Sequence, residues 1–354
     1  MAEQTTRIYR HDYESDIPDG EPLRIANTSP PWRLFGTKED LDGSISAREI
    51  STQQTLRGKN FRPTEDEARL VDAALVLRRP MLVEGEPGIG KTSLAYSVAW
   101  QLGLGNVFKW PITSRSTLKE ALYQYDAIAR LHAVSLEKGD TPKDGESTTK
   151  PKHEIGDYLT LGPLGSVLIP NKTGPYQPRV LLVDEIDKSD IDLPNDLLHV
   201  LEEGSFVIPE IARLKLKKPS QIRLYNSTET VEVPADGRIV CDDFPFVVMT
   251  TNGEREFSPA FKRRCLPLKM QRPEEEKLRT IIATHLGDKW AQDDSLEQLG
   301  SFLEKLNNKE QLAVDQLLNA VYLTHSDADV NPEKHTALKQ AVLKSLSDNL
   351  ISGD

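Results

Sequence analysis

The sequence has little cysteine, no long apolar run and a deficit of positive charge. Its two cysteines, Cys241 and Cys265, form no C-x-x-C pair, which argues against a disulfide framework or a zinc site. No apolar run approaches the roughly 18 residues that a membrane span requires, and the first residues lack the apolar core of a secretory signal. We therefore expect no membrane contact and a cytoplasmic location.

The charge balance limits the partners that the chain can attract. Its 354 residues include 44 basic and 55 acidic side chains, a formal net charge of −11, so general attraction to nucleic acid is not expected. Residues 211–224 are an exception, since they contain basic residues and no acidic one. This stretch is either a loop that meets a substrate or nucleic acid, or an exposed hairpin whose lysines protect its edge. We favour the hairpin.

A glycine-rich turn follows the short apolar run at 81–83 and precedes a segment typical of a helix. The turn reads G-x-x-x-x-G-K-T, a pattern in which backbone N–H groups surround the phosphates of a nucleotide. We expect Lys91 to reach the β and γ phosphates and Thr92 to offer its hydroxyl to Mg²⁺. The predicted nucleotide contacts in this turn are Gly85, Glu86, Pro87, Gly88, Ile89, Gly90, Lys91, Thr92 and Ser93.

A second motif places two carboxylates directly after a buried strand. The four apolar residues 180–183 predict a central strand of a parallel sheet, and ligands collect at the carboxyl ends of such strands. Asp184 is the expected ligand of Mg²⁺, directly or through water. Glu185 is the residue expected to orient and deprotonate the attacking water.

Two further positions complete the predicted site. Asn252 ends a third apolar strand, at 244–251, where its uncharged amide can hydrogen-bond the γ-phosphate or the attacking water. Arg263 and Arg264 follow soon after, and an arginine supplied by a neighbouring subunit stabilises the charge that develops during phosphoryl transfer. The predicted catalytic residues are Glu185, Asn252, Arg264, Arg263 and Lys91.

The remaining sequence suggests three parts. Residues 1–59 are polar and rich in turn-forming residues, and we expect an arm, partly irregular, there. Residues 60–272 contain the motifs and are expected to form an α/β core. Residues 273–354 show only helical patterns, with helices expected near 274–286, 295–307, 310–325 and 333–350.

Within the core, local patterns predict individual elements. Thr64, followed by Glu67, is typical of a helix N-cap. The polar residues 113–117 are expected to begin a helix that includes Tyr123. Hairpin strands are expected at 205–208 and through the run 211–233.

Together these residues resemble an AAA+ ATPase, and more closely a MoxR-like one. The likeness covers about residues 60–350: Gly85 to Thr92 correspond to Walker A, Val180 to Asp187 to Walker B, and Asn252 to sensor 1. It implies a P-loop core with a central parallel sheet flanked by helices, followed by a small all-α lid, with ATP and Mg²⁺ bound between them.

The resemblance also implies assembly. Such proteins form rings, usually of six subunits, in which an arginine of one subunit completes the site of the next; by position Arg264 is the first choice and Arg263 the second. Two segments, 155–169 and 205–245, match hairpin insertions of this group. One departure is that the stretch 310–316 lacks the arginine that lids often direct at the γ-phosphate, and Lys309 is a poor substitute.

These expectations lead to three hypotheses for function. The first is a Mg²⁺-dependent, ATP-hydrolysing ring that remodels or activates another protein, as MoxR-like proteins are thought to do with partners that carry von Willebrand A domains. The second is a nucleotide-controlled switch in a bacterial defence or signalling system. The third, suggested by the basic stretch 211–224, is a nucleic-acid translocase of the restriction type.

Overall fold

The fold is built on a five-stranded parallel sheet. The computed structural model describes residues 9, 51–139, 154–170, 177–242, 244–286, 300, 314, 316–319 and 321. The strand order is β11-β1-β10-β5-β2, and every neighbouring pair is parallel. The bounds are β11 Leu266–Lys269, β1 Met81–Glu84, β10 Phe246–Thr251, β5 Val180–Asp184 and β2 Val107–Pro111. This confirms the predicted central parallel sheet and brings the tips of β1, β10 and β5 side by side.

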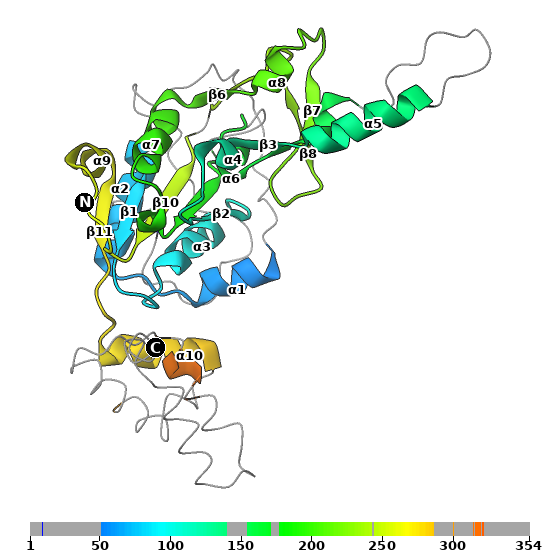
Figure 1. Ribbon diagram of the computed structural model, residues 1–354. Helices are drawn as coiled ribbons and strands as arrows, with labels where there is room; N and C mark the ends of the chain where they lie inside the picture. Colours follow the sequence, from blue (N-terminus) through cyan, green and yellow to red (C-terminus); the bar gives the residue numbers. More distant parts are fainter. Residues whose placement is uncertain are drawn as a thin grey trace, which may run out of the picture.

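Helices cover both faces of this sheet, because the central strands are apolar on both sides. Leu182 and its neighbours pack with α2 (Glu65–Leu77) and α3 (Lys91–Gln101), whereas Leu181 and Val183 pack on the other face with α6 (Pro163–Val167), α7 (Leu193–Glu203) and α9 (Pro259–Arg264). Figure 1 shows α3 and α7 on opposite sides of the strands. The sheet is therefore the middle layer of three, with a hydrophobic core above and below it.

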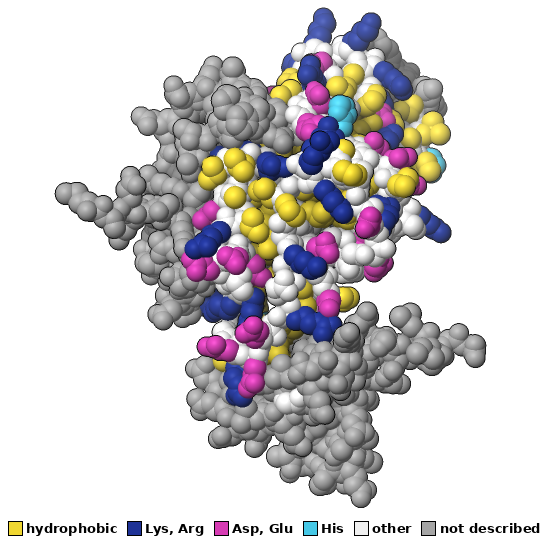
Figure 2. Space-filling model, turned by 90° about the vertical axis from the view of Figure 1, so that its left-hand side faces the viewer, with side chains coloured by type: hydrophobic (Ala, Val, Ile, Leu, Met, Phe, Trp, Pro, Cys, Tyr) yellow, Lys and Arg dark blue, Asp and Glu magenta, His cyan; other side chains and the backbone are white. Residues whose placement is uncertain are grey.

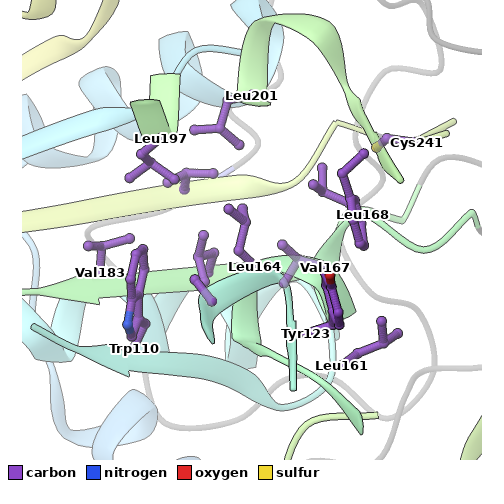
Figure 3. Packing of buried hydrophobic residues seen from close by; sticks show 14 of the residues in the cluster. Trp110, Tyr123, Leu161, Leu164, Val167, Leu168, Val183, Leu197, Leu201 and Cys241 are labelled. Carbon is purple, nitrogen blue, oxygen red and sulfur yellow. The ribbon is translucent and has the colours of Figure 1, made fainter. Parts of the chain in front are cut away.

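The core on the α7 side is continuous with the inserted segments. In Figure 3, Leu164 and Val167 lie between the strand residues Trp110 and Val183 on one side and Tyr123 and Leu161 on the other, Leu168 lies near Cys241, and Leu197 and Leu201 of α7 lie above. Gly165 permits this close packing, since a Cβ at this position would lie 1.9 Å from the carbonyl oxygen of Leu122. The insertions are thus held rigidly against the sheet.

Helix boundaries follow the expected capping chemistry. The Thr64 side chain accepts a hydrogen bond from the Glu67 N–H, and the Glu67 carboxylate accepts one from the Thr64 N–H, which confirms the predicted capping box at the start of α2. Helix α7 ends at Gly204, which is left-handed with φ 59°, a conformation that glycine adopts without steric cost.

The first described helix was not predicted. Residues 52–59, within the expected N-terminal arm, belong to α1 (Thr52–Asn60), which lies against α3. The helix is polar and shows no apolar stripe, and it approaches α3 through Gly58, where a Cβ would lie 2.5 Å from the Tyr96 carbonyl oxygen. Tyr9 is also fully buried, and its hydroxyl donates a hydrogen bond to Ser97 of α3 (2.9 Å). The rest of the predicted arm lies outside the described residues.

Strands from the two segments expected to be insertions, 155–169 and 205–245, join residues 123–125 in a small four-stranded sheet. Its order is β3 (Tyr123–Tyr125), β4 (Leu159–Leu161), β7 (Ser220–Arg223) and β8 (Thr230–Val233), and β7 and β8 are the predicted hairpin. The predicted helix through Tyr123 is wrong: α4 (Leu118–Leu122) stops, β3 pairs with β4, and the chain becomes helical again in α5 (Ala127–Gly139). Pairing with a partner strand about forty residues away overrides the local helical pattern.

The basic stretch 211–224 is only partly a hairpin. Ile211, expected in a strand, is in the short helix α8 (Pro209–Ala212), since proline at its first position favours a helix start. Lys217 and Lys218 lie in the connection from α8 to β7 and line a cavity of about 550 Å³ with Arg130 of α5. A separate pair of strands, β6 (Ser205–Val207) and β9 (Arg238–Val240), flanks this segment, and the short 3₁₀ helix η2 (Ile155–Tyr158) precedes β4.

Among the described residues, helix α10 (Glu275–Leu286) follows the sheet along the chain. This helix agrees with the helix expected near 274–286 and buries Leu278 and Ile282. The helices expected near 295–307, 310–325 and 333–350 lie outside the described residues except for isolated positions, at which Leu317 and Val321 are buried.

Candidate nucleotide-binding site

The glycine-rich turn forms an open loop between β1 and α3. Gly88 and Gly90 have φ angles of 74° and 96°, which side chains disfavour. A Cβ at Gly85 would lie 2.4 Å from the end of the Ile89 side chain and 3.1 Å from the Met270 carbonyl oxygen, so a larger residue there would displace the Ile89 side chain. The N-terminus of α3 begins directly after Gly90, and such a turn with free N–H groups at a helix start is suited to an anionic phosphate.

Lys91 is held at the centre of this loop. Its Nζ donates hydrogen bonds to the carbonyl oxygens of Gly85 (2.6 Å) and Glu86 (2.7 Å) and to Oδ1 of Asn252 (2.8 Å). The residue is 7% exposed, and burial lowers the pKa of its ammonium group, although nearby carboxylates, Asp187 and Glu185 first among them, act in the opposite direction. The Lys91 ammonium group is thus held next to the loop by uncharged amide and carbonyl oxygens, and the oxygens of a bound phosphate can take their place.

Asp184, at the tip of β5, is linked to α3, β2 and β10. Its Oδ1 accepts hydrogen bonds from the hydroxyls of Thr92 (3.1 Å) and Thr250 (2.8 Å), and its Oδ2 pairs with Nζ of Lys109 on β2 (2.7 Å). Burial tends to raise the pKa of this carboxyl, but the hydrogen bonds from Lys109, Thr250 and Thr92 and the Lys109 charge lower it overall. Asp184 therefore stays ionised.

Thr92 and Asp184 fit the magnesium site that the sequence predicts. A hydroxyl and a carboxylate oxygen lie within hydrogen-bond distance of each other beside the phosphate loop, and Mg²⁺ bound with nucleotides takes few protein ligands because phosphates and water supply the rest. In the part of the chain that the structure describes, no cluster of three or more His, Cys, Asp or Glu side chains could hold a metal by itself. A metal held jointly with phosphate is consistent with both facts.

Glu185 adopts an unusual backbone conformation. Its φ and ψ are 62° and 53°, in the left-handed region, and its N–H donates to Oγ1 of Thr250 (2.9 Å). The side chain is 41% exposed and pairs with Nζ of Lys188 (2.7 Å), which raises the pKa of Lys188. The carboxylate therefore lies at the edge of the site in contact with a cation and with solvent.

Asn252 lies at the tip of β10, the strand next to β5. Besides accepting from Lys91, it donates its backbone N–H to Oδ2 of Asp187 (2.9 Å), and its side-chain amide reaches Glu254 (3.4 Å). Because β10 pairs with β5, Asn252 lies beside the strand tip that carries Asp184.

Most of the predicted site residues surround one pocket of about 420 Å³. Its lining combines residues of the phosphate loop with Asp184, Glu185, Thr250 and Asn252. Glu86 instead directs its side chain to Arg272 (2.5 Å), and Ile89 packs beneath the loop. A larger cavity of about 700 Å³ lies at the free edge of β2, but it lacks the phosphate loop and both carboxylates. The smaller pocket has the matching chemistry, and the roles of its residues stay predictions.

The two predicted arginines are not part of this pocket. Arg263 and Arg264 are in the last turn of α9, and Arg264 pairs with Glu202 of α7 (2.6 Å). The Arg79 guanidinium donates hydrogen bonds to the carbonyl oxygens of Arg263, Arg264 and Cys265 at the end of this helix. This separation is compatible with the predicted action on a neighbouring subunit, which stays a prediction.

Among the residues that sequence reasoning missed, three contact the predicted residues at the tips of β5 and β10. Lys109 pairs with Asp184, Thr250 contacts Asp184 and Glu185, and Asp187 holds the backbone of Asn252. For Thr250 a signal existed, since a residue two positions before Asn252 on a strand lies on the same face.

Comparison with known proteins identifies the domain type. Residues 80–265, more than half of the chain, match the family model described as AAA domain (dynein-related subfamily). Lon protease 2 of Bacillus subtilis (strain 168) is 24% identical over 322 residues, which cover 84% of this chain and 52% of that protein. Protein CbbQ of Allochromatium vinosum is 40% identical over 43 residues, 12% of this chain and 58% of that protein.

These matches cover only part of each relative. The chain spans a little over half the length of the two curated relatives it matches, 52% and 58%. Among the described residues, no helix is both long and apolar enough to cross a bilayer.

Proposed function

Since the chain belongs to the family of AAA domains, dynein-related subfamily, we propose that it is a Mg²⁺-dependent AAA+ ATPase that converts ATP and water to ADP and phosphate. The observation that carries this proposal is the convergence of Lys91, Thr92, Asp184, Glu185 and Asn252 on a single pocket. These residues come from the tips of two adjacent strands, β5 and β10, and from the start of α3, and their chemistry matches what phosphoryl transfer needs.

Each residue has a proposed task. Lys91 leaves the carbonyl oxygens of the loop to neutralise the phosphates, and Thr92 with Asp184 holds Mg²⁺, which supplies further charge neutralisation when bound. Glu185 orients the attacking water and accepts its proton, and its half-exposed carboxylate is fully available for this once Lys188 releases Oε2. Asn252, already hydrogen-bonded to Lys91, reports the state of the γ-phosphate.

We also propose that the active form is a ring, with six subunits as the expected number, in which Arg264 acts on the next subunit. Figure 2 shows the side of the molecule that carries α9, where hydrophobic side chains gather in the middle among lysines, arginines and acids. A mixed face of this kind supports a subunit contact. Arg264 is 47% exposed and its pair with Glu202 is exposed as well, so leaving Glu202 costs little.

The ring is proposed to remodel or activate another protein, and a partner with a von Willebrand A domain is the candidate from the resemblance to MoxR-like proteins. The small sheet β3-β4-β7-β8 supports a separate docking element, since it is built from the insertions and is distinct from the five-stranded sheet. The subunits are proposed to work in the cytoplasm, away from membranes.

The test compares the wild type with Glu185→Gln. The variant keeps the shape of the side chain and the N–H bond to Thr250, so ATP affinity should stay within about threefold, while kcat falls by roughly 10²–10⁴, the usual contribution of general-base catalysis. Glu232→Gln, an exposed acid on β8, is the matched control and should retain the wild-type rate. If the wild type does not hydrolyse ATP, or Glu185→Gln hydrolyses it normally, the proposal is wrong. Proteins retained on Glu185→Gln with ATP would identify the partner.

A nucleotide-controlled switch is the second candidate, and the Lys188–Glu185 ion pair favours it, since a carboxylate held by a lysine suits slow turnover. Here the biological output would survive Glu185→Gln. A nucleic-acid translocase is the third candidate; Lys217 and Lys218 beside the 550 Å³ cavity support it. It requires salt-dependent binding that falls when Lys215, Lys217 and Lys218 are neutralised.

A further inference from the structure

The tips of β5 and β10 are joined by side chains that run in both directions. From β10, the Thr250 hydroxyl donates to Oδ1 of Asp184 (2.8 Å) and accepts from the N–H of Glu185 (2.9 Å). One hydroxyl therefore fixes the side chain of the predicted metal ligand and the backbone of the predicted base. Thr250 is 1% exposed, so solvent cannot replace either bond.

The return connection comes from the segment after β5. Asp187, in the 3₁₀ helix η3 (Ile186–Lys188), accepts hydrogen bonds at Oδ2 from the N–H groups of Asn252 (2.9 Å) and Glu254 (3.3 Å). It is 6% exposed, and its Oδ1 finds no hydrogen-bond partner among the described residues. A buried carboxylate is costly unless it is well paired, so this placement is not explained by surface solubility or by helix capping.

The backbone at Glu185 makes this arrangement more than ordinary strand pairing. A left-handed conformation is disfavoured for a residue with a side chain, and such a conformation persists only where surrounding bonds determine it. The bond from the Glu185 N–H to Thr250 is one such bond. Glu185 is the N-cap of η3, and its side chain pairs with Lys188, whereas the Asp184 side chain contacts Thr92, Thr250 and Lys109.

We propose that Thr250 and Asp187 form a reciprocal clamp of positioning residues, which holds the base Glu185 and the phosphate-sensing Asn252 as one rigid unit. This inference rests on the proposed ATPase function. Thr250 acts through Glu185 and Asp184, and Asp187 acts through Asn252; neither needs to touch the nucleotide. A displacement of the β5 tip therefore displaces the β10 tip as well, and the reverse, so that Glu185 and Asn252 move together.

The alternative is that both side chains only satisfy buried backbone groups. In that case their loss would lower thermal stability and would not act through the catalytic residues. Thr250→Val separates the two cases, because valine matches threonine in shape and branching but lacks the hydroxyl, and Thr250→Ser restores the hydroxyl.

The experiment measures kcat, the KM for ATP and the Mg²⁺ dependence of the full-length protein. Thr250→Val should lower kcat by about 10- to 100-fold with the KM for ATP within about threefold, because bonds to positioning groups act mainly in the transition state. It should also raise the Mg²⁺ concentration needed for half-maximal rate, since Asp184 loses one of its donors. Thr250→Ser should recover most of the lost rate.

A double-mutant cycle decides whether Thr250 acts through Glu185. In a Glu185→Gln background, Thr250→Val should reduce the residual rate by less than about threefold, since the base that it positions is already lost. A full 10- to 100-fold further loss would overturn the clamp, and so would an unchanged kcat in the single variant. If Thr250→Val does not fold, Asp187→Asn and Asn252→Ala provide the same cycle on the other half of the clamp. The losses in kcat of these two variants should not add in the double variant. Additive losses would refute the clamp. Absence of hydrolysis by the wild type would refute the ATPase function itself.

Discussion

Lys109 offers a perturbation with opposite effects on stability and on metal binding. Its ammonium group pairs with Oδ2 of Asp184 at 2.7 Å, with side chains that are 38% and 16% exposed. Lys109→Met removes the cation that pairs with the Asp184 carboxylate and keeps an unbranched side chain close in length to the aliphatic part of lysine. The bonds from Thr92 and Thr250 to the other oxygen remain.

The expected destabilisation lies between two limits. Breaking a fully buried pair costs about 3–5 kcal/mol, whereas exposed pairs contribute about 0.2–1 kcal/mol. Since Lys109 is more than one third exposed, we expect a loss of about 1–3 kcal/mol in the free energy of unfolding, which lowers Tm by roughly 2–10 °C for a domain of this size.

The pH dependence has a defined sign. The pKa of Asp184 is below its ordinary value in the folded protein, so its stabilising contribution is present above the unfolded pKa of about 3.9 and is lost as the pH falls through the folded pKa. The difference in stability between Lys109→Met and the wild type should therefore be full at neutral pH and should shrink as the pH falls below about 4.

The affinity for Mg²⁺ should rise in Lys109→Met, although its stability falls. In the proposed site Mg²⁺ would share the Asp184 carboxylate with Lys109, so the variant should need less Mg²⁺; a gain of about 1 kcal/mol corresponds to roughly fivefold. Thermal denaturation in EDTA and then in MgCl₂ with a non-hydrolysable ATP analogue measures both effects. Arg69→Met, which removes an exposed pair with Glu65 on α2, is the control and should change Tm by less than about 2 °C. An unchanged Tm for Lys109→Met, or a higher Mg²⁺ requirement, would refute this reasoning.

Two further predictions concern α9 and the insertions. Arg264→Ala should lower the ATPase rate of the assembled protein by about 10³ or more, while Glu202→Gln, which only releases the exposed Arg264 pair, should change it less than about fivefold; steady-state rates of equal size for both variants would contradict this assignment. Gly165→Ala should destabilise the protein by about 1–3 kcal/mol, because its Cβ would overlap the Leu122 carbonyl oxygen at 1.9 Å. Denaturant unfolding measures this loss. A free energy of unfolding equal to that of the wild type would contradict the prediction and would mean that α6 can shift away from Leu122 without cost.

The sequence predicted which residues come together at the pocket better than it predicted their surroundings, for physical reasons. Lys91, Asp184 and Asn252 each follow a short apolar run, and parallel strands end at one edge of the sheet, so these groups had to approach each other. Local pattern does not set strand order, so the position of β10 between β1 and β5 could not be read from the motifs alone.

The features that sequence reasoning missed depend on contacts between distant segments. Tyr123 reads as helical until it pairs with Leu161, and α1 packs through Gly58, which leaves no apolar stripe to detect. Thr250 and Asp187 act on backbone N–H groups of the neighbouring strand, and no local pattern marks such partners.

Mixing two inactive variants tests most directly whether the site is completed by a neighbouring subunit. Arg264→Ala retains Glu185 in its own pocket, and Glu185→Gln retains Arg264 for the next one. In rings assembled from equal amounts of both, roughly a quarter of the interfaces join an intact pocket to an intact arginine. The account predicts that neither variant alone hydrolyses ATP at more than a small fraction of the wild-type rate and that the mixture regains up to about a quarter of that rate. A mixture no more active than its components would contradict it.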